Sequence, residues 1–139
     1  MIRIFAFLVL LLAPPAAANA GDPAAAAQYQ RIITSQLEAF RSDDAALAYS
    51  FAAPSIRQAF PTPLAFMAMV KRAYKPVYRA QSYRFGDTVT DAQGRPGQRV
   101  TLTGPDGKTY EALYTMELQP DGTWLIVGCA LLNVSGLAA

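Results

Sequence analysis

The spacing of hydrophobic residues changes halfway along the chain. In residues 24–41, large apolar side chains recur every three or four positions: Tyr29, Ile33, Leu37 and Phe40. This spacing predicts an amphipathic helix with one buried face. From about residue 83 onward, apolar and polar residues alternate, as they do in half-buried strands. We therefore expect an α+β fold with helices first and a sheet second.

Polar residues and prolines divide the helical half. The short polar side chains of residues 42–44 can accept hydrogen bonds from free N–H groups, so a second helix should begin there and run to residue 53. Its buried face should carry Leu47 and Phe51. One more helical turn is expected over residues 55–60.

Thr62 and Pro63 mark the start of a further helix, because a hydroxyl cap followed by proline suits a first helical turn. This helix should cover residues 63–74 and end before Pro76. Its apolar residues lie on more than one side: Leu64, Phe66, Met67, Met69, Val70 and Tyr74. We therefore expect it to be wedged between two packed layers.

Turn sequences divide the second half into four strands. The expected strands cover residues 83–89, 99–103, 109–118 and 123–134. A loop at 91–97 and two Gly-Pro or Gln-Pro turns ending in Asp-Gly separate them. The prediction is an antiparallel meander of four strands, curved around the helices.

The last strand is apolar on both faces. Strict alternation places one set on one face, namely Trp124, Ile126, Gly128, Ala130 and Leu132. The other set is Leu125, Val127, Cys129 and Leu131. Helices cover one face, so the other needs a loop, a ligand cavity or a second subunit. A homodimer through the sheet is our hypothesis for that face.

The N-terminus has the pattern of a secretory signal peptide. A positive start at Arg3 precedes an apolar run, and Ala18-Asn19-Ala20 matches the small-x-small cleavage pattern. The run is too short for a membrane-spanning helix, so we expect no transmembrane anchor. The expected organisation is a signal peptide at 1–20, a linker at 21–28, one domain at 29–134 and a tail at 135–139. The mature protein should be periplasmic or secreted.

Composition excludes several kinds of chemistry. The chain has no histidine and one cysteine, Cys129, so it has no imidazole base, no imidazole metal site and no internal disulfide. We expect Cys129 to be a buried, inert thiol. The sequence predicts no metal site and no cofactor.

Several segments match one bacterial family. They are residues 36–44, 51–56, 62–63, 66–70, 76–79, 112–116 and 121–129. On these segments the chain resembles the proteins grouped as domain of unknown function 4864, which are exported proteins found mainly in proteobacteria. The order of elements is similar to the cone of the nuclear transport factor 2-like superfamily. The resemblance implies a pocket between helices and sheet, and it implies no particular activity.

A basic region lies in the middle of the chain. Residues 45–86 contain no Asp or Glu but hold six cationic side chains: Arg57, Lys71, Arg72, Lys75, Arg79 and Arg84. Interleaved with tyrosines, they form either an anion-binding patch or a solvated surface. We expect no nucleic-acid partner, since no binding motif is present.

Seven residues are the expected ligand contacts: Tyr49, Phe66, Met69, Tyr74, Tyr78, Arg79 and Tyr114. They predict a non-catalytic domain that binds a small apolar or anionic ligand. An isomerase or dehydratase is the enzyme alternative, and it needs a pocket carboxylate beside a tyrosine. Glu117 is the best placed acid, but alternation turns it away from Tyr114. A structural domain that dimerises through its sheet is the third reading.

Overall fold

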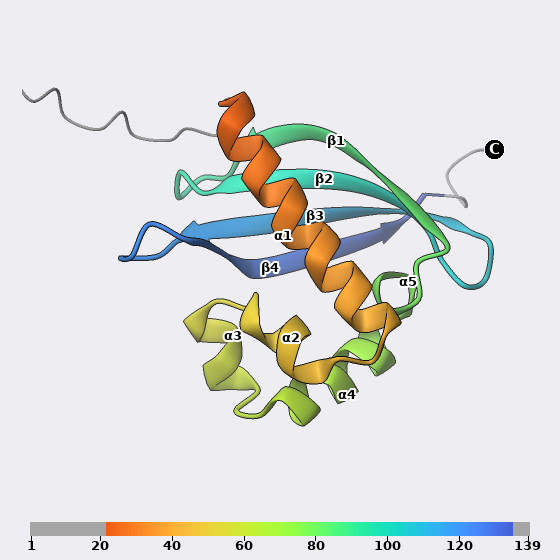
Figure 1. The fold of residues 1–139 in the computed structure, drawn as a ribbon. Helices are drawn as coiled ribbons and strands as arrows, with labels where there is room; N and C mark the ends of the chain where they lie inside the picture. Colours follow the sequence, from red (N-terminus) through yellow and green to blue (C-terminus); the bar gives the residue numbers. More distant parts are fainter. Residues whose placement is uncertain (1–21, 135–139) are drawn as a thin grey trace, which may run out of the picture.

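Helices occupy the first half of the chain and strands the second (Figure 1). The computed structural model describes residues 22–134, so the expected signal peptide and C-terminal tail lie outside the described residues. The helices are α1 (Pro23–Arg41), α2 (Ala45–Ser50), α3 (Pro54–Ala59), α4 (Pro63–Ala73) and α5 (Lys75–Tyr78). The strands are β1 (Ser82–Thr90), β2 (Pro96–Thr103), β3 (Thr109–Leu118) and β4 (Trp124–Asn133). This is the α+β arrangement that the change of period predicts.

Helix α1 lies across one face of the sheet (Figure 1). The Asp22 side chain caps it by accepting a hydrogen bond from the backbone N–H of Ala24, at 3.0 Å. The apolar stripe expected from the sequence is buried: Tyr29, Ile33, Leu37 and Phe40. Helix α1 begins at Pro23, so most of the segment expected as a linker, 21–28, is helical.

Helix α2 is shorter than expected. Asp44 caps it through the backbone N–H of Leu47, at 3.1 Å, but the helix ends at Ser50 and not at residue 53. The helix ends early because the residues that follow it form backbone hydrogen bonds with β4. The N–H of Ile126 donates to the carbonyl of Phe51 at 2.8 Å, and the N–H of Ala53 donates to the carbonyl of Ile126 at 2.8 Å.

The expected buried face of α2 is partly wrong. Leu47 is 45% exposed, whereas the small residue Ala48 is fully buried against the core. Phe51 is half-buried and packs against that core. This short helix packs against the core through the small residue Ala48. The apolarity of the residues alone does not show which of them is buried.

Helix α4 begins as expected, with the Thr62 hydroxyl accepting from the N–H of Ala65 at 3.1 Å. It buries one face, and Leu64 is 77% exposed, so the expectation of a helix wedged between two layers is wrong. Pro76 does not end the helical region. It lies in the first turn of α5, where a missing N–H costs no hydrogen bond.

The four strands pair in the order β1-β2-β3-β4, each antiparallel to the next. Asp106 and Asp121 hold the last two turns by accepting from the backbone N–H two residues later, at 3.0 Å in each case. The helices lie on one side of the sheet and beyond its β4 edge (Figure 1). The core lies between helices and sheet.

A β-bulge in β4 overturns the face assignment made from strict alternation. Thr115 pairs with Gly128 and Met116 pairs with Ile126, so Val127 is an extra residue in β4. Trp124 and Ile126 face the core before the bulge. After it, Cys129 and Leu131 pack against the core, while Ala130 and Leu132 are exposed. Each predicted set is therefore split between the two faces of the sheet.

Within residues 22–134, no helix combines the length and the apolar character needed to cross a membrane.

Candidate functional site

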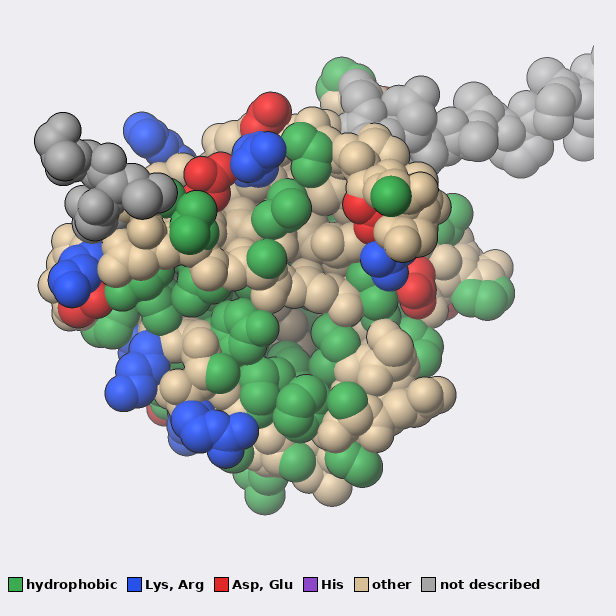
Figure 2. All heavy atoms as spheres, turned by 180° about the vertical axis from the view of Figure 1, so that it is seen from behind, with side chains coloured by type: hydrophobic (Ala, Val, Ile, Leu, Met, Phe, Trp, Pro, Cys, Tyr) green, Lys and Arg blue, Asp and Glu red, His purple; other side chains and the backbone are tan. Residues whose placement is uncertain are grey.

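An apolar cavity of about 460 Å³ lies between the helices α3, α4 and α5 and the strand β4. It opens to solvent as a hollow ringed by hydrophobic side chains (Figure 2). Its volume is within the range of about 300–1,000 Å³ that is typical of small-molecule pockets.

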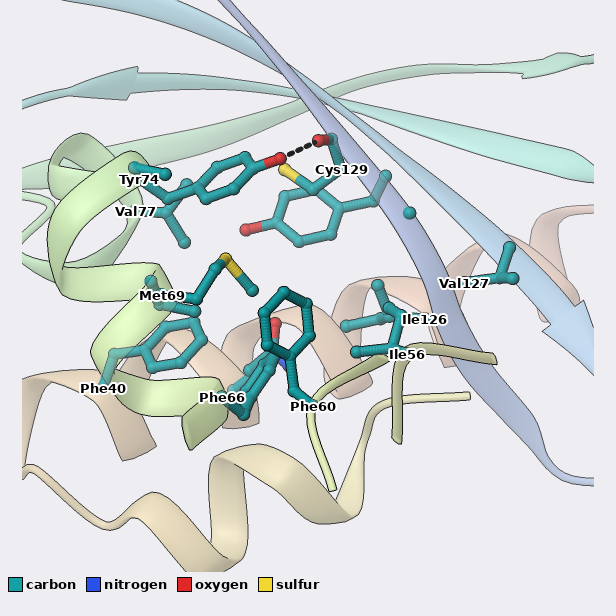
Figure 3. Close-up of a pocket in the computed structure, with 15 residues that line it drawn as sticks. Phe40, Ile56, Phe60, Phe66, Met69, Tyr74, Val77, Ile126, Val127 and Cys129 are labelled. Atoms are coloured by element: carbon teal, nitrogen blue, oxygen red, sulfur yellow. Dashed lines mark hydrogen bonds between the residues drawn. The ribbon is translucent and has the colours of Figure 1, made fainter. Parts of the chain in front are cut away.

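The lining comes from three parts of the fold. Helices α3 to α5 and the residues next to them supply Ile56, Phe60, Phe66, Met69, Val70, Ala73, Tyr74 and Val77. Helix α1 contributes Gln36 and Phe40 at the inner end, and the sheet contributes Tyr114, Ile126, Val127, Gly128 and Cys129. Side chains from the helices converge on β4 (Figure 3). No Asp, Glu, Lys or Arg is among these lining residues.

Two irregularities in the backbone shape this cavity. The chain breaks between α4 and α5 at Tyr74, which has φ −131° and ψ 46°. From this position the Tyr74 hydroxyl donates a hydrogen bond to the carbonyl of Cys129, at 3.2 Å (Figure 3). On the opposite wall, the bulge at Val127 turns Cys129 to the core side beside Tyr114, its partner in the sheet register. The break and the bulge thus place these two walls against each other.

Tyr114 is the buried polar side chain of the sheet wall. Its hydroxyl is inaccessible to solvent and has no hydrogen-bond partner within the described residues. Burial raises the pKa of Tyr114 well above its ordinary value, and the neighbouring Cys129 raises it further. The Cys129 thiol is near enough to contribute to this shift, but the hydroxyl has no hydrogen bond that satisfies it. The tyrosine is therefore neutral and unpaired.

Cys129 is also held in its neutral form. The residue as a whole is half-buried, but burial of its thiol among apolar side chains raises the pKa to about 12. A thiol is a poor nucleophile when its thiolate is this unfavourable. Chemistry by Cys129 at neutral pH is thus disfavoured.

The cavity wall includes four of the seven residues expected as ligand contacts: Phe66, Met69, Tyr74 and Tyr114. Tyr49 lies behind this wall, where its ring packs against Phe66 at 5.6 Å and its hydroxyl donates to the carbonyl of Phe60 at 2.7 Å. Tyr78 and Arg79 lie outside the lining.

Tyr78 and Arg79 join α5 to the end of α1. The Arg79 guanidinium donates to the carbonyl of Phe40 at 2.5 Å and pairs with the Asp43 carboxylate at 2.8 Å. The Tyr78 hydroxyl also donates to Asp43, which has a positive φ of 54°. The hydrogen bond from Tyr78, with support from Arg79, lowers the pKa of Asp43. These contacts hold the two helices together and leave Arg79 fully engaged.

Among the described residues, the cavity has neither a metal-binding cluster nor a carboxylate in its lining. In the part of the chain that the structure describes, no group of three or more His, Cys, Asp or Glu side chains has metal-binding spacing. Glu117 lies half-buried on β3, next in sequence to the buried Met116, and its carboxylate accepts from Gln119 at 3.2 Å. It is not part of the lining.

Comparison with known proteins identifies the family. A family model described as "Domain of unknown function (DUF4864)" matches residues 23–139. The chain belongs to this family. No curated protein and no solved structure matches the chain. The similarity of this DUF4864 chain to nuclear transport factor 2-like cones therefore stays a prediction.

Sequence reasoning missed part of the DUF4864 cavity. Ile56 and Phe60 lie in the helical turn expected over residues 55–60 but were not among the expected contacts, and Val77 lies on the unexpected helix α5. Gln36 is 4% exposed and donates to the carbonyl of Ala48 at 3.1 Å. A polar residue on the apolar face of α1 was a usable signal, since Gln36 lies three residues after Ile33 and four before Phe40.

Proposed function

We propose that the protein is a non-catalytic binding domain for a small apolar or amphipathic molecule. The observation that carries this proposal is an open cavity of about 460 Å³ with an apolar lining. Water in such a cavity has few hydrogen-bond partners, so an apolar guest gains free energy by replacing it. The buried aromatic and aliphatic side chains provide the contact area.

The enzyme alternative receives less support from this cavity. An isomerase or dehydratase mechanism needs a carboxylate base within reach of the substrate. The lining supplies Tyr114 and Cys129, both with raised pKa, and no acid. Binding is therefore the function that the lining favours.

Export and dimerisation, the other two predictions from the sequence, differ in their support. The pattern at residues 1–20 supports cleavage after Ala20, so the purified mature chain should have the mass of a protein that begins at Gly21. The dimer has weaker support, because Arg99 pairs with Asp87 and Glu111 on the outer face of the sheet, at 3.2 Å in each case. An apolar interface there would have to cover these charges.

A blocking substitution tests the cavity. Ala73 is exposed and part of the lining, so Ala73→Trp should fill the mouth. The matched control is Ala68→Trp, which changes an exposed residue of α4 outside the lining. We expect the uncharged fluorophore N-phenyl-1-naphthylamine to bind the wild type and Ala68→Trp, and to bind Ala73→Trp at least tenfold more weakly. Equal binding to both variants, with equal unfolding midpoints, would contradict the proposal.

A further inference from the structure

The six cationic side chains of the basic region differ in how many contacts they make with the rest of the fold. Arg57 donates to the carbonyls of Ala52 and Ser50, at 2.9 Å in each case. Arg79 is bound to Asp43 and the end of α1, as described above. The ammonium of Lys71 lies 5.5 Å from the centre of the Tyr78 ring. These three have structural contacts, and Arg84 lies on β1, outside the cavity lining.

Arg72 and Lys75 remain. Both are exposed, and neither takes part in an ion pair within residues 22–134. In sequence they bracket Ala73 and Tyr74, which are both cavity-lining residues. Two positive charges therefore flank the segment of chain that forms this part of the cavity wall.

The position of Arg72 follows from helix geometry. Residues three apart on a helix are neighbours on its surface, so Arg72 lies beside Met69, a half-buried lining residue. Figure 2 shows basic side chains at the lower left, beyond the hydrophobic side chains that ring the hollow, on the flank that α4 and α5 form. A positive rim next to an apolar interior matches a molecule with one anionic end.

We propose that the occupant is a single-chain amphiphile with an anionic head, a proposal that rests on the binding function proposed above. The chain lies in the cavity against Phe66, Met69 and Ile126. The head remains at the mouth, where Arg72 and Lys75 neutralise it without being buried. A cationic head would be repelled there, and a neutral head would gain nothing from the two charges.

The absence of charge from the lining supports this orientation. An anion placed at the inner end would meet the neutral Tyr114 and Cys129, and it would lose its hydration without gaining a cation. At the mouth the head keeps part of its hydration and gains two positive charges. The chain therefore enters first and the head stays outside.

A head-group series tests the proposal. Dodecanoate, dodecanol and dodecyltrimethylammonium, each below its micelle concentration, compete against N-phenyl-1-naphthylamine at low salt. We expect affinity in the order carboxylate, alcohol, ammonium, with about fourfold gain for each methylene added to the carboxylate until the cavity is full. Arg72→Glu/Lys75→Glu should weaken the binding of dodecanoate by about tenfold and leave the binding of dodecanol unchanged.

The control is Arg84→Glu/Lys108→Glu, which makes the same change in net charge at exposed positions outside the cavity. It should leave dodecanoate binding within about twofold of the wild type. Equal affinity for carboxylate and alcohol, with no effect of Arg72→Glu/Lys75→Glu, would overturn the anionic head while the binding function stands. Failure of the fluorophore and of all three chains to bind would overturn both.

The same assay separates two sources of such a molecule. A monoacyl phosphatidylglycerol has the same chain with a larger anionic head. Competition by dodecanoate alone indicates a free fatty acid. Competition by both indicates that the mouth also accepts a membrane-derived lipid. Either result supports the single anionic chain.

Discussion

At the scale of single residues, the cavity is built to stay uncharged. Tyr114 and Cys129 are register partners on neighbouring strands, and burial raises the pKa of both. The charged residues nearby are either tied into structural contacts, as Arg79 is, or exposed at the mouth, as Arg72 is. The binding proposed above therefore depends on shape and apolarity inside the cavity, and charge acts only at its mouth.

The unpaired hydroxyl of Tyr114 gives a direct prediction. Leaving a buried hydroxyl without a partner costs about 1–3 kcal/mol. Tyr114→Phe should therefore leave the free energy of unfolding unchanged or raise it by about 1 kcal/mol, as measured by urea unfolding. Tyr74→Phe is the control, because it removes a hydroxyl that is hydrogen-bonded, and it should cost about 1 kcal/mol. A clear loss of stability in Tyr114→Phe would mean that its hydroxyl has a partner after all.

The thiol of Cys129 predicts sensitivity to alkali. Its pKa rises from the ordinary value of 9.0 to about 12 in the folded protein. The folded state therefore keeps a proton that the unfolded state loses, so this stabilisation is complete below pH 9 and is lost as the pH rises towards 12. Over that window the unfolding constant should increase by up to about tenfold per pH unit.

Cys129→Ala removes this effect together with the smaller part of the Tyr114 pKa shift that the thiol causes, while burial, the main cause, still raises the pKa of Tyr114. Between pH 9 and 11, its unfolding constant should rise less steeply than that of the wild type. The same slope in both proteins, from denaturant unfolding at each pH, would show that the thiol does not ionise differently on folding.

At the scale of elements, the period of the sequence predicted where helices and strands lie, and long-range contacts decided their ends. Strand β3 has the bounds that were expected, because clear turns enclose it. Helix α2 ends early because the backbone groups of the residues after it form hydrogen bonds with β4. The bulge at Val127 is set by strand pairing, which a single sequence does not display, so the faces of β4 were assigned wrongly.

The bulge makes Leu131 and Leu132 differ in a way that strict alternation reverses. Leu131 packs against the core, and Leu132 is 55% exposed. Leu131→Ala should lower the free energy of unfolding by about 2 kcal/mol, while Leu132→Ala should change it by less than about 0.5 kcal/mol. Thermal or urea unfolding of the two variants checks the order. If Leu132→Ala were the more damaging change, the register of β4 would be wrong.

The same limits apply to the candidate site. Aromatic and methionine positions at helical spacing marked Phe66, Met69 and Tyr74, which lie on the cavity wall. Tyr78 and Arg79 were chosen for their charge and aromatic character, but the fold uses them to fasten α5 to α1. Which basic residues stay free depends on these tertiary contacts, and the sequence alone gives all six equal weight.

At the scale of the whole molecule, one layer of helices and one sheet enclose a space that their own side chains do not fill. The break at Tyr74 and the bulge at Val127 shape opposite walls of that space. The outer face of the sheet carries paired charges at Arg99, so the space between helices and sheet is the more apolar of the two surfaces. The proposed binding function is therefore assigned to this space and not to the outer face of the sheet.

Native mass spectrometry of the protein purified from its own host tests this central claim most directly. We predict a chain with bound extra mass that is lost on denaturation, and that is absent from Ala73→Trp but present in Ala68→Trp. The released molecule should be apolar or amphipathic. A chain free of added mass, with no difference between wild type and Ala73→Trp in fluorophore binding, would contradict the account.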